Sequence, residues 1–180
     1  MFKSITEKGY GRAVTEIENM PKFTLMQRMG IDFAIAGRTE ADSSLMGEEL
    51  FRGEQFIEKI PLAGWLLAEG VVKPSERTYT AFLDMQRAVM TNFFVDELQS
   101  AGITFEEHPA EYRKLAKFIN IATGRGTMPK GRLGKLILDL PFFAPRYTLS
   151  RLQLLNMTLN PAAYANMPPH TRKIIARTSL

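Results

Sequence analysis

The sequence contains no cysteine and only two histidines, His108 and His170, among its 180 residues. The absence of cysteine excludes disulfides, thiolate metal sites and cysteine nucleophiles. Two histidines that lie 62 residues apart also exclude a multi-histidine metal site within one chain, so we expect no cofactor. Charged residues are scarce as well, at 23% against 45% hydrophobic residues, which leaves ample apolar material for a core.

Long apolar runs are also missing. The chain becomes polar within its first eight residues, unlike a signal peptide. It has no run of about 20 mostly apolar residues that could span a bilayer. The uncharged stretch 152–171 contains three prolines, which indicate a helix, a loop and a second helix. We therefore expect a soluble protein, without a transmembrane segment, that forms the single domain 1–180.

Acidic residues are almost absent from the second part of the chain. Residues 112–180 hold 12 Lys/Arg and one acid, Asp139, whereas residues 1–111 hold 11 Lys/Arg and 18 Asp/Glu. The acidic part therefore carries a net charge of −7 and the basic part +11. This asymmetry indicates a polyanionic partner such as nucleic acid, an anionic membrane surface or an acidic protein. The alternative is that the two parts pack together and neutralise each other.

Apolar residues recur at spacings of three and four, and strand-like alternation is almost absent. This pattern predicts an all-α fold, a single bundle of about seven to nine helices. The main predicted helices cover residues 11–20, 23–36, 45–58, 75–101, 109–123, 133–140, 146–155 and 170–178, with an apolar plug at 60–72. Gly37 is expected to end the helix 23–36.

The clearest predicted element is the long helix 75–101, which Ser75 is placed to cap and Gly102 to end. We expect it to be the central strut of the fold. Its large apolar residues follow helical spacing: Tyr79, Phe82, Leu83, Val89, Met90, Phe93, Phe94 and Leu98. Two later helices carry similar stripes, one formed by Leu115, Phe118, Ile119 and Ala122 and the other by Leu149, Leu152 and Leu155.

Residues 123–135 combine four glycines with four basic residues and no acid. Glycines let backbone N–H groups approach an anion and the cations add charge, so this loop fits contact with nucleic acid phosphates. It is not a Walker A motif, because Pro129 stands where the first glycine belongs and Leu136 follows Lys135. The alternative is a solvated loop without a ligand.

No catalytic constellation is visible. Adjacent carboxylates occur at 48–49, 96–97 and 106–107, and neighbours in sequence do not face each other on a helix. Only Asp84 and Asp139 stand within apolar runs, and Asp139 is expected to pair with Arg146 or Arg151. Neither the serines nor His170 has the context of a nucleophile elbow or triad. We therefore predict that the protein is not an enzyme.

Five strings occur together in one order: Ser75–Leu83, Lys117–Gly126, Phe142–Arg146, Ser150–Leu152, and Pro168–Pro169 leading to Arg172–Lys173. Over about residues 15–178 they resemble a helical region of large polyvalent proteins of bacteriophages, prophages and other mobile elements. In such proteins this region typically follows enzymatic domains such as helicase or methylase modules. The resemblance implies a protein of the virion or the host cytoplasm and assigns no chemistry to the region itself.

Two hypotheses follow. The first is a non-catalytic phage-type module, virion- or DNA-associated, that binds nucleic acid phosphates through six cations: Arg125, Lys130, Arg132, Lys135, Arg146 and Arg151. The second is a protein-interaction or oligomerising structural module, a phage structural piece or a host-factor inhibitor, with an apolar patch of Trp65, Phe142 and Phe143. A shared exposed face of the six cations favours the first hypothesis. Pairing of these six cations with Glu48, Glu49, Glu106 and Glu107 favours the second.

Overall fold

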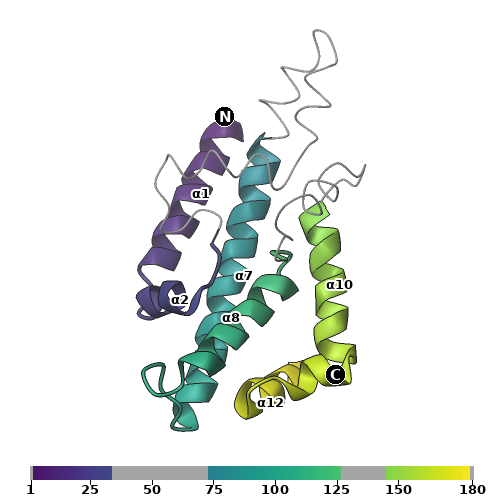
Figure 1. Cartoon of the computed structure of the whole chain (residues 1–180). Helices are drawn as coiled ribbons and strands as arrows, with labels where there is room; N and C mark the ends of the chain where they lie inside the picture. The colour runs from purple at the N-terminus through teal and green to yellow at the C-terminus, as the bar shows by residue number, and fades with distance from the viewer. Residues whose placement is uncertain (1, 34–72, 127–144, 179–180) are drawn as a thin grey trace.

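The computed structural model describes residues 2–33, 73–126 and 145–178, and these segments contain helices and no strand (Figure 1). The predicted all-α class is confirmed for them. The helices are α1 (Phe2–Glu18), α2 (Phe23–Met29), α7 (Lys73–Ser100), α8 (Pro109–Ala122), α10 (Pro145–Leu159), α11 (Pro161–Ala165) and α12 (Pro169–Thr178). The predicted helices 45–58 and 133–140 and the plug 60–72 lie outside the described residues.

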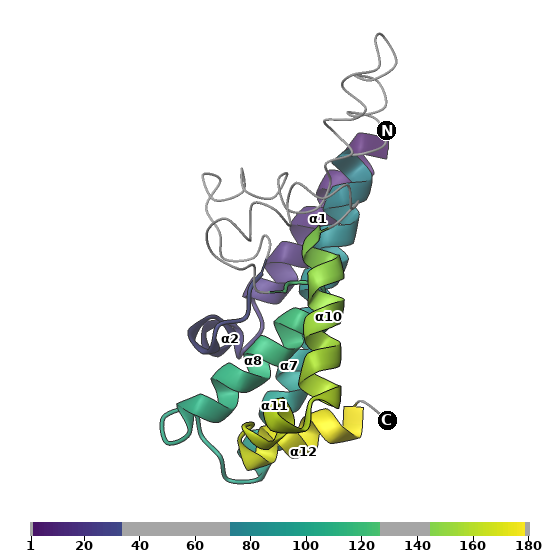
Figure 2. The same ribbon diagram turned by 45° about the vertical axis from the view of Figure 1, so that its right-hand side comes forward.

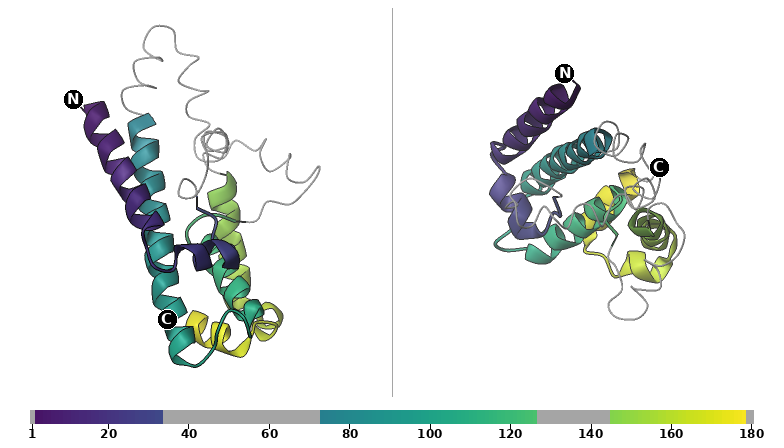
Figure 3. Two further views of the ribbon diagram at one scale, coloured as in Figure 1. Left: turned by 90° about the vertical axis from the view of Figure 1, so that its left-hand side faces the viewer. Right: turned by 90° about the horizontal axis from the view of Figure 1, so that it is seen from above.

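Helix α7 is the central element, and its 28 residues agree with the predicted helix 75–101 to within two residues at each end. Helix α1 packs along one side of α7, and α8 packs on another (Figure 1). Viewed from above, α1, α7 and α8 follow one another as layers, and α10 lies beside α8 (Figure 3). Helices α11 and α12 close the lower end of the molecule (Figure 2).

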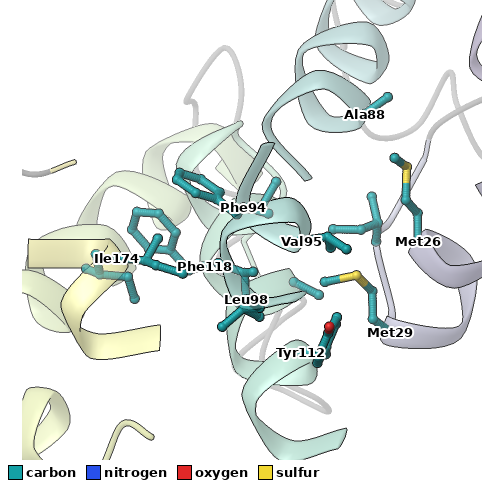
Figure 4. Close-up of a cluster of buried hydrophobic side chains, with 14 of the residues drawn as sticks. Met26, Met29, Ala88, Phe94, Val95, Leu98, Tyr112, Phe118 and Ile174 are labelled. Carbon is teal, nitrogen blue, oxygen red and sulfur yellow. The ribbon is translucent and has the colours of Figure 1, made fainter. Parts of the chain in front are cut away.

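The core forms where α2, α7, α8 and α12 meet (Figure 4). Met26 and Met29 of α2 enter it from one side, and Ile174 of α12 enters from the other. Between them lie buried residues of α7 and α8, among them Val95, Leu98, Tyr112 and Phe118. The stripe predicted from Leu115 to Ala122 is confirmed, since Leu115, Phe118 and Ile119 are buried and Ala122 packs against them. Each such side chain contributes about 1.5–3 kcal/mol through burial.

The second helix is much shorter than the predicted 23–36. Gly30 ends it with a left-handed backbone (φ +95°), which glycine adopts without strain. The N–H of Gly30 donates to Gln27 O and that of Ile31 to Met26 O, the two bonds of a Schellman motif. The prediction of Gly37 as the stop was wrong. Ile31 and Phe33 are buried although they lie after the end of the helix. In the sequence they therefore resemble a continuation of the apolar face of the helix.

The first helix is longer than the predicted 11–20, because it begins at Phe2. It passes through Gly9 and Gly11, each of which costs an isolated helix about 1 kcal/mol relative to alanine. Packing along α7 offsets this cost, and the apolar spacing had placed the start of the helix too late.

Candidate functional site

The densest polar cluster is centred on Arg87, which lies on the inner face of α7 and is only 1% exposed. Its guanidinium donates from NH1 to Asp84 Oδ1 (2.5 Å), from Nε to Thr123 Oγ1 (2.8 Å) and from NH2 to Thr123 O (2.9 Å). Asp84 is fully buried, in agreement with its place in an apolar run. Because a guanidinium stays protonated in proteins, this burial is tolerated only with such partners.

A second pair extends the cluster toward the segment after α2. Arg125 NH1 donates to Asp32 Oδ2 (3.2 Å), and the Arg125 side chain is 7% exposed. Asn120 of α8 binds the same segment, because its Nδ2 donates to Gly30 O (2.8 Å) and its Oδ1 accepts from Asp32 N (2.9 Å). Residues 30–33 are therefore attached to the C-terminal end of α8 by an ion pair and two backbone contacts.

The turn 123–126 joins this cluster to α10. Gly124 has φ +89°, and Arg125 N donates to Asn120 O (2.7 Å), so the chain leaves α8 through another Schellman-type turn. A Cβ on Gly126 would lie 2.9 Å from both Cα and N of Ser150, which is itself fully buried. Only glycine permits this approach of the turn to the backbone of α10.

The charges of the Arg87 cluster have a structural role. Burial lowers the pKa of Arg87, the Asp84 carboxylate acts against this shift, and the positive charge of Arg125 adds to it. The guanidinium uses its donors on Asp84 and Thr123, so its geometry fixes α7 to the turn after α8. Within the described part of the chain, no three His, Asp or Glu side chains come together in a way that could hold a metal ion.

A further polar contact fixes α12. Glu111, 6% exposed, accepts from Thr171 N (2.9 Å) and His170 N (3.3 Å) through its two carboxylate oxygens, and it also binds the Thr171 hydroxyl. A carboxylate at a helix N-terminus satisfies free N–H groups and matches the helix dipole. Glu111 therefore caps α12 from another helix, which no sequence motif had indicated.

The structure describes the side chains of two of the six cations that the sequence grouped as a phosphate-binding set, Arg125 and Arg151. Arg125 is buried in an ion pair with Asp32 and is therefore not exposed for contact with phosphate. Arg151 is exposed on α10. The side chain of Arg146 and all of Lys130, Arg132 and Lys135 lie outside the described residues, as do Trp65, Phe142, Phe143, Glu48, Glu49 and Asp139.

Several cations of the described residues pair with acids of α7 and of the turn after it. Lys22 binds Asp96, and Arg177 NH1 lies 2.7 Å from Glu97 Oε1. Arg28 NH1 lies 3.4 Å from Glu106 Oε1, and the Arg28 guanidinium also covers the Phe105 ring at 4.8 Å. Arg177 and Arg125 thus connect the basic part of the chain to its acidic part.

Two helix faces expose large apolar side chains. Phe82, Val89 and Phe93 lie on the outer face of α7, and Leu152, Leu155 and Leu159 lie on α10; all are 53–73% exposed. The predicted apolar stripes contain five of these residues, Phe82, Val89, Phe93, Leu152 and Leu155, and the structure exposes all five. The inner face of α7 at this level holds Thr80, Asp84, Arg87 and Thr91 instead.

Comparison with known proteins adds no relative. No family model, no curated protein and no solved structure matches the chain. Among the described helices, none is both long and apolar enough to cross a membrane.

Proposed function

We propose that this chain is a non-catalytic structural module that assembles with further copies of itself through the apolar outer faces of α7 and α10. The observation that carries the proposal is the exposure of six large apolar side chains in two helical rows. Single exposed apolar residues are ordinary, but rows of them mark interaction surfaces.

In residues 80–93 of α7, four polar side chains are buried and three large apolar side chains are exposed. The polar residues Thr80, Asp84, Arg87 and Thr91 recur at helical spacing on the buried face, whereas three large apolar residues recur on the opposite face. Phe93 is 65% exposed and rests edge-on against the buried Phe94, with ring centroids 5.5 Å apart. Contact with another apolar surface would remove this row from water, which favours assembly over an isolated chain.

On α10 the row has the spacing of a helix–helix seam. Leu152, Leu155 and Leu159 are separated by three and then four residues, and no charged residue lies between them. The opposite side of α10 is anchored to the turn at Gly126 through Ser150, so the leucines face outward. In a two-fold assembly the same patch meets itself, and an uncharged leucine row is complementary to its own copy.

The resemblance to polyvalent phage proteins supports a structural reading. Several resembling strings supply contacts that hold the helices together: Thr123 binds Arg87, Gly126 meets Ser150, and α12 follows Pro168 with its N-terminus on Glu111. Within this proposal the chain is one bundle of seven to nine helices, a virion-associated piece of a phage-type protein. Relatives of this kind would share the helical scaffold with this chain, and the scaffold would catalyse no reaction.

Sedimentation velocity of the purified chain over a wide concentration range tests the proposal. We expect self-association that weakens at least about tenfold when Leu152, Leu155 and Leu159 are all replaced by glutamine, which corresponds to about 1.4 kcal/mol. The matched control is Asn156→Gln, at an exposed polar position of the same helix, which should leave association unchanged. A wild-type chain that stays monomeric at every concentration would refute self-assembly.

A further inference from the structure

The outer face of α8 carries three exposed cations close together, Arg113, Lys114 and Lys117. Residues three and four apart on a helix are neighbours, and four residues span about 6 Å of helix, so the three charges share one short face. Among the described residues none of the three has an acidic partner, in contrast to Lys22, Arg28 and Arg177.

No acid is exposed on α8, α10, α11 or α12, and the exposed Glu106 in the turn before α8 pairs with Arg28. Glu111 is the only acid in α8, α10, α11 and α12, and it is buried with its carboxylate on the N-terminus of α12. The same four helices contain eight Lys or Arg residues. The positive potential of α8 is therefore not cancelled by carboxylates on its own surface or on these neighbours.

We infer that the outer face of α8 is a binding surface for the backbone phosphates of nucleic acid, with Arg113, Lys114 and Lys117 supplying the charge. This surface is distinct from the loop 124–135 that the sequence favoured, and it does not depend on self-assembly through α7 and α10. Binding of this kind needs spaced cations and carries little sequence preference.

The composition of the face favours nucleic acid over the other polyanions. Protein interfaces are enriched in large apolar and aromatic residues and depleted of lysine, and helices that lie on membranes insert an apolar face. The outer face of α8 presents Ala110 beside its cations, and the large apolar side chains of α8 are buried in the core. The exposed apolar rows are on α7 and α10, and so a protein partner has those faces to use.

The test is fluorescence anisotropy of labelled duplex DNA with the full chain across a salt series. Replacing Arg113, Lys114 and Lys117 with glutamine removes three phosphate contacts, which should reduce the slope of log K against log salt by about 2.7. Between 50 and 200 mM salt, the fold-loss of affinity should therefore be about 40 times smaller for the variant than for the wild type. Because all three side chains are exposed, the melting temperature should stay close to that of the wild type.

The matched control replaces three paired cations, Lys22, Arg28 and Arg177, with glutamine and so changes the net charge by the same amount. We expect it to retain most of the salt dependence. An equal loss in both triple variants would show that overall charge drives binding and would overturn the assignment to α8. Absence of DNA binding at low salt, unchanged binding by the α8 variant, or binding only to vesicles of anionic lipid would overturn it as well.

Discussion

Removing the Arg87 guanidinium should destabilise the protein more than any exposed substitution. In Arg87→Met the chain loses three hydrogen bonds and leaves the Asp84 carboxylate, which is 0% exposed, without its cation. Breaking a buried ion pair from one side costs about 3–5 kcal/mol. A chain of this size has about 5–15 kcal/mol of stability and loses about 2–4 °C of melting temperature per kcal/mol, so we expect a drop of about 6–20 °C.

The double variant Asp84→Leu with Arg87→Met separates the ion pair from the packing around it. Without the carboxylate no buried charge is left unpaired, and the remaining cost includes that of the Thr123 carbonyl and hydroxyl that lose their donors, about 1–3 kcal/mol. The double variant should therefore be more stable than Arg87→Met alone.

Urea unfolding monitored by circular dichroism gives both free energies. A single variant that loses less than about 1 kcal/mol would refute the buried pair as an organising contact. A double variant less stable than the single variant would show that the packing of these side chains, and not their charges, carries the effect.

Three further predictions concern Gly126, Glu111 and Tyr112. Gly126→Ala would place a Cβ 2.9 Å from the backbone of Ser150 and should lower the free energy of unfolding in urea by about 1–3 kcal/mol. Gly9→Ala, which has open space around it, should raise the same free energy by about 0.5–1 kcal/mol. Equal effects of the two variants would contradict the close contact at Gly126. Glu111→Gln weakens the cap of α12 and should cost about 0.5–2 kcal/mol, measured as melting temperature at neutral pH; no change would contradict the cap. Burial, and to a lesser degree the charge of Glu106, raises the pKa of Tyr112 above its ordinary 10.0. The folded state therefore favours the neutral phenol, so the contribution of Tyr112 to the free energy of unfolding is fully present below pH 10 and is lost as the pH rises above it. Tyr112→Phe should make this decline smaller.

The helices that sequence analysis located best are those whose ends carry local signals. The long helix ends before Gly102 and α8 before Gly124, both glycines with positive φ, and Pro109 begins α8. The same signal at Gly30 was overlooked, because the buried residues after it continued the apolar pattern. End signals are local interactions, which is why they can be read from a short stretch of sequence.

The inward face of α7 could not be chosen from the sequence. Phe82, Val89 and Phe93 fit one helical stripe, and the polar residues 80, 84, 87 and 91 fit another, so periodicity supports both orientations equally. The Asp84–Arg87 pair decides between them only together with Thr123, which lies 36 residues away from Arg87. Contacts over such a separation, like the one between Glu111 and Thr171, depend on tertiary packing and leave no local motif.

The cysteine-free chain allows a direct test of self-assembly through α10. A single Leu155→Cys substitution places a thiol at the middle of the leucine row, and a disulfide between two copies forms only if their Cα atoms come within about 7 Å. We expect rapid oxidation to a covalent dimer on a non-reducing gel, with Lys114→Cys, at another exposed position on α8, remaining largely monomeric. Equal dimer yields at both positions, or no dimer at Leu155→Cys, would contradict assembly through the leucine row.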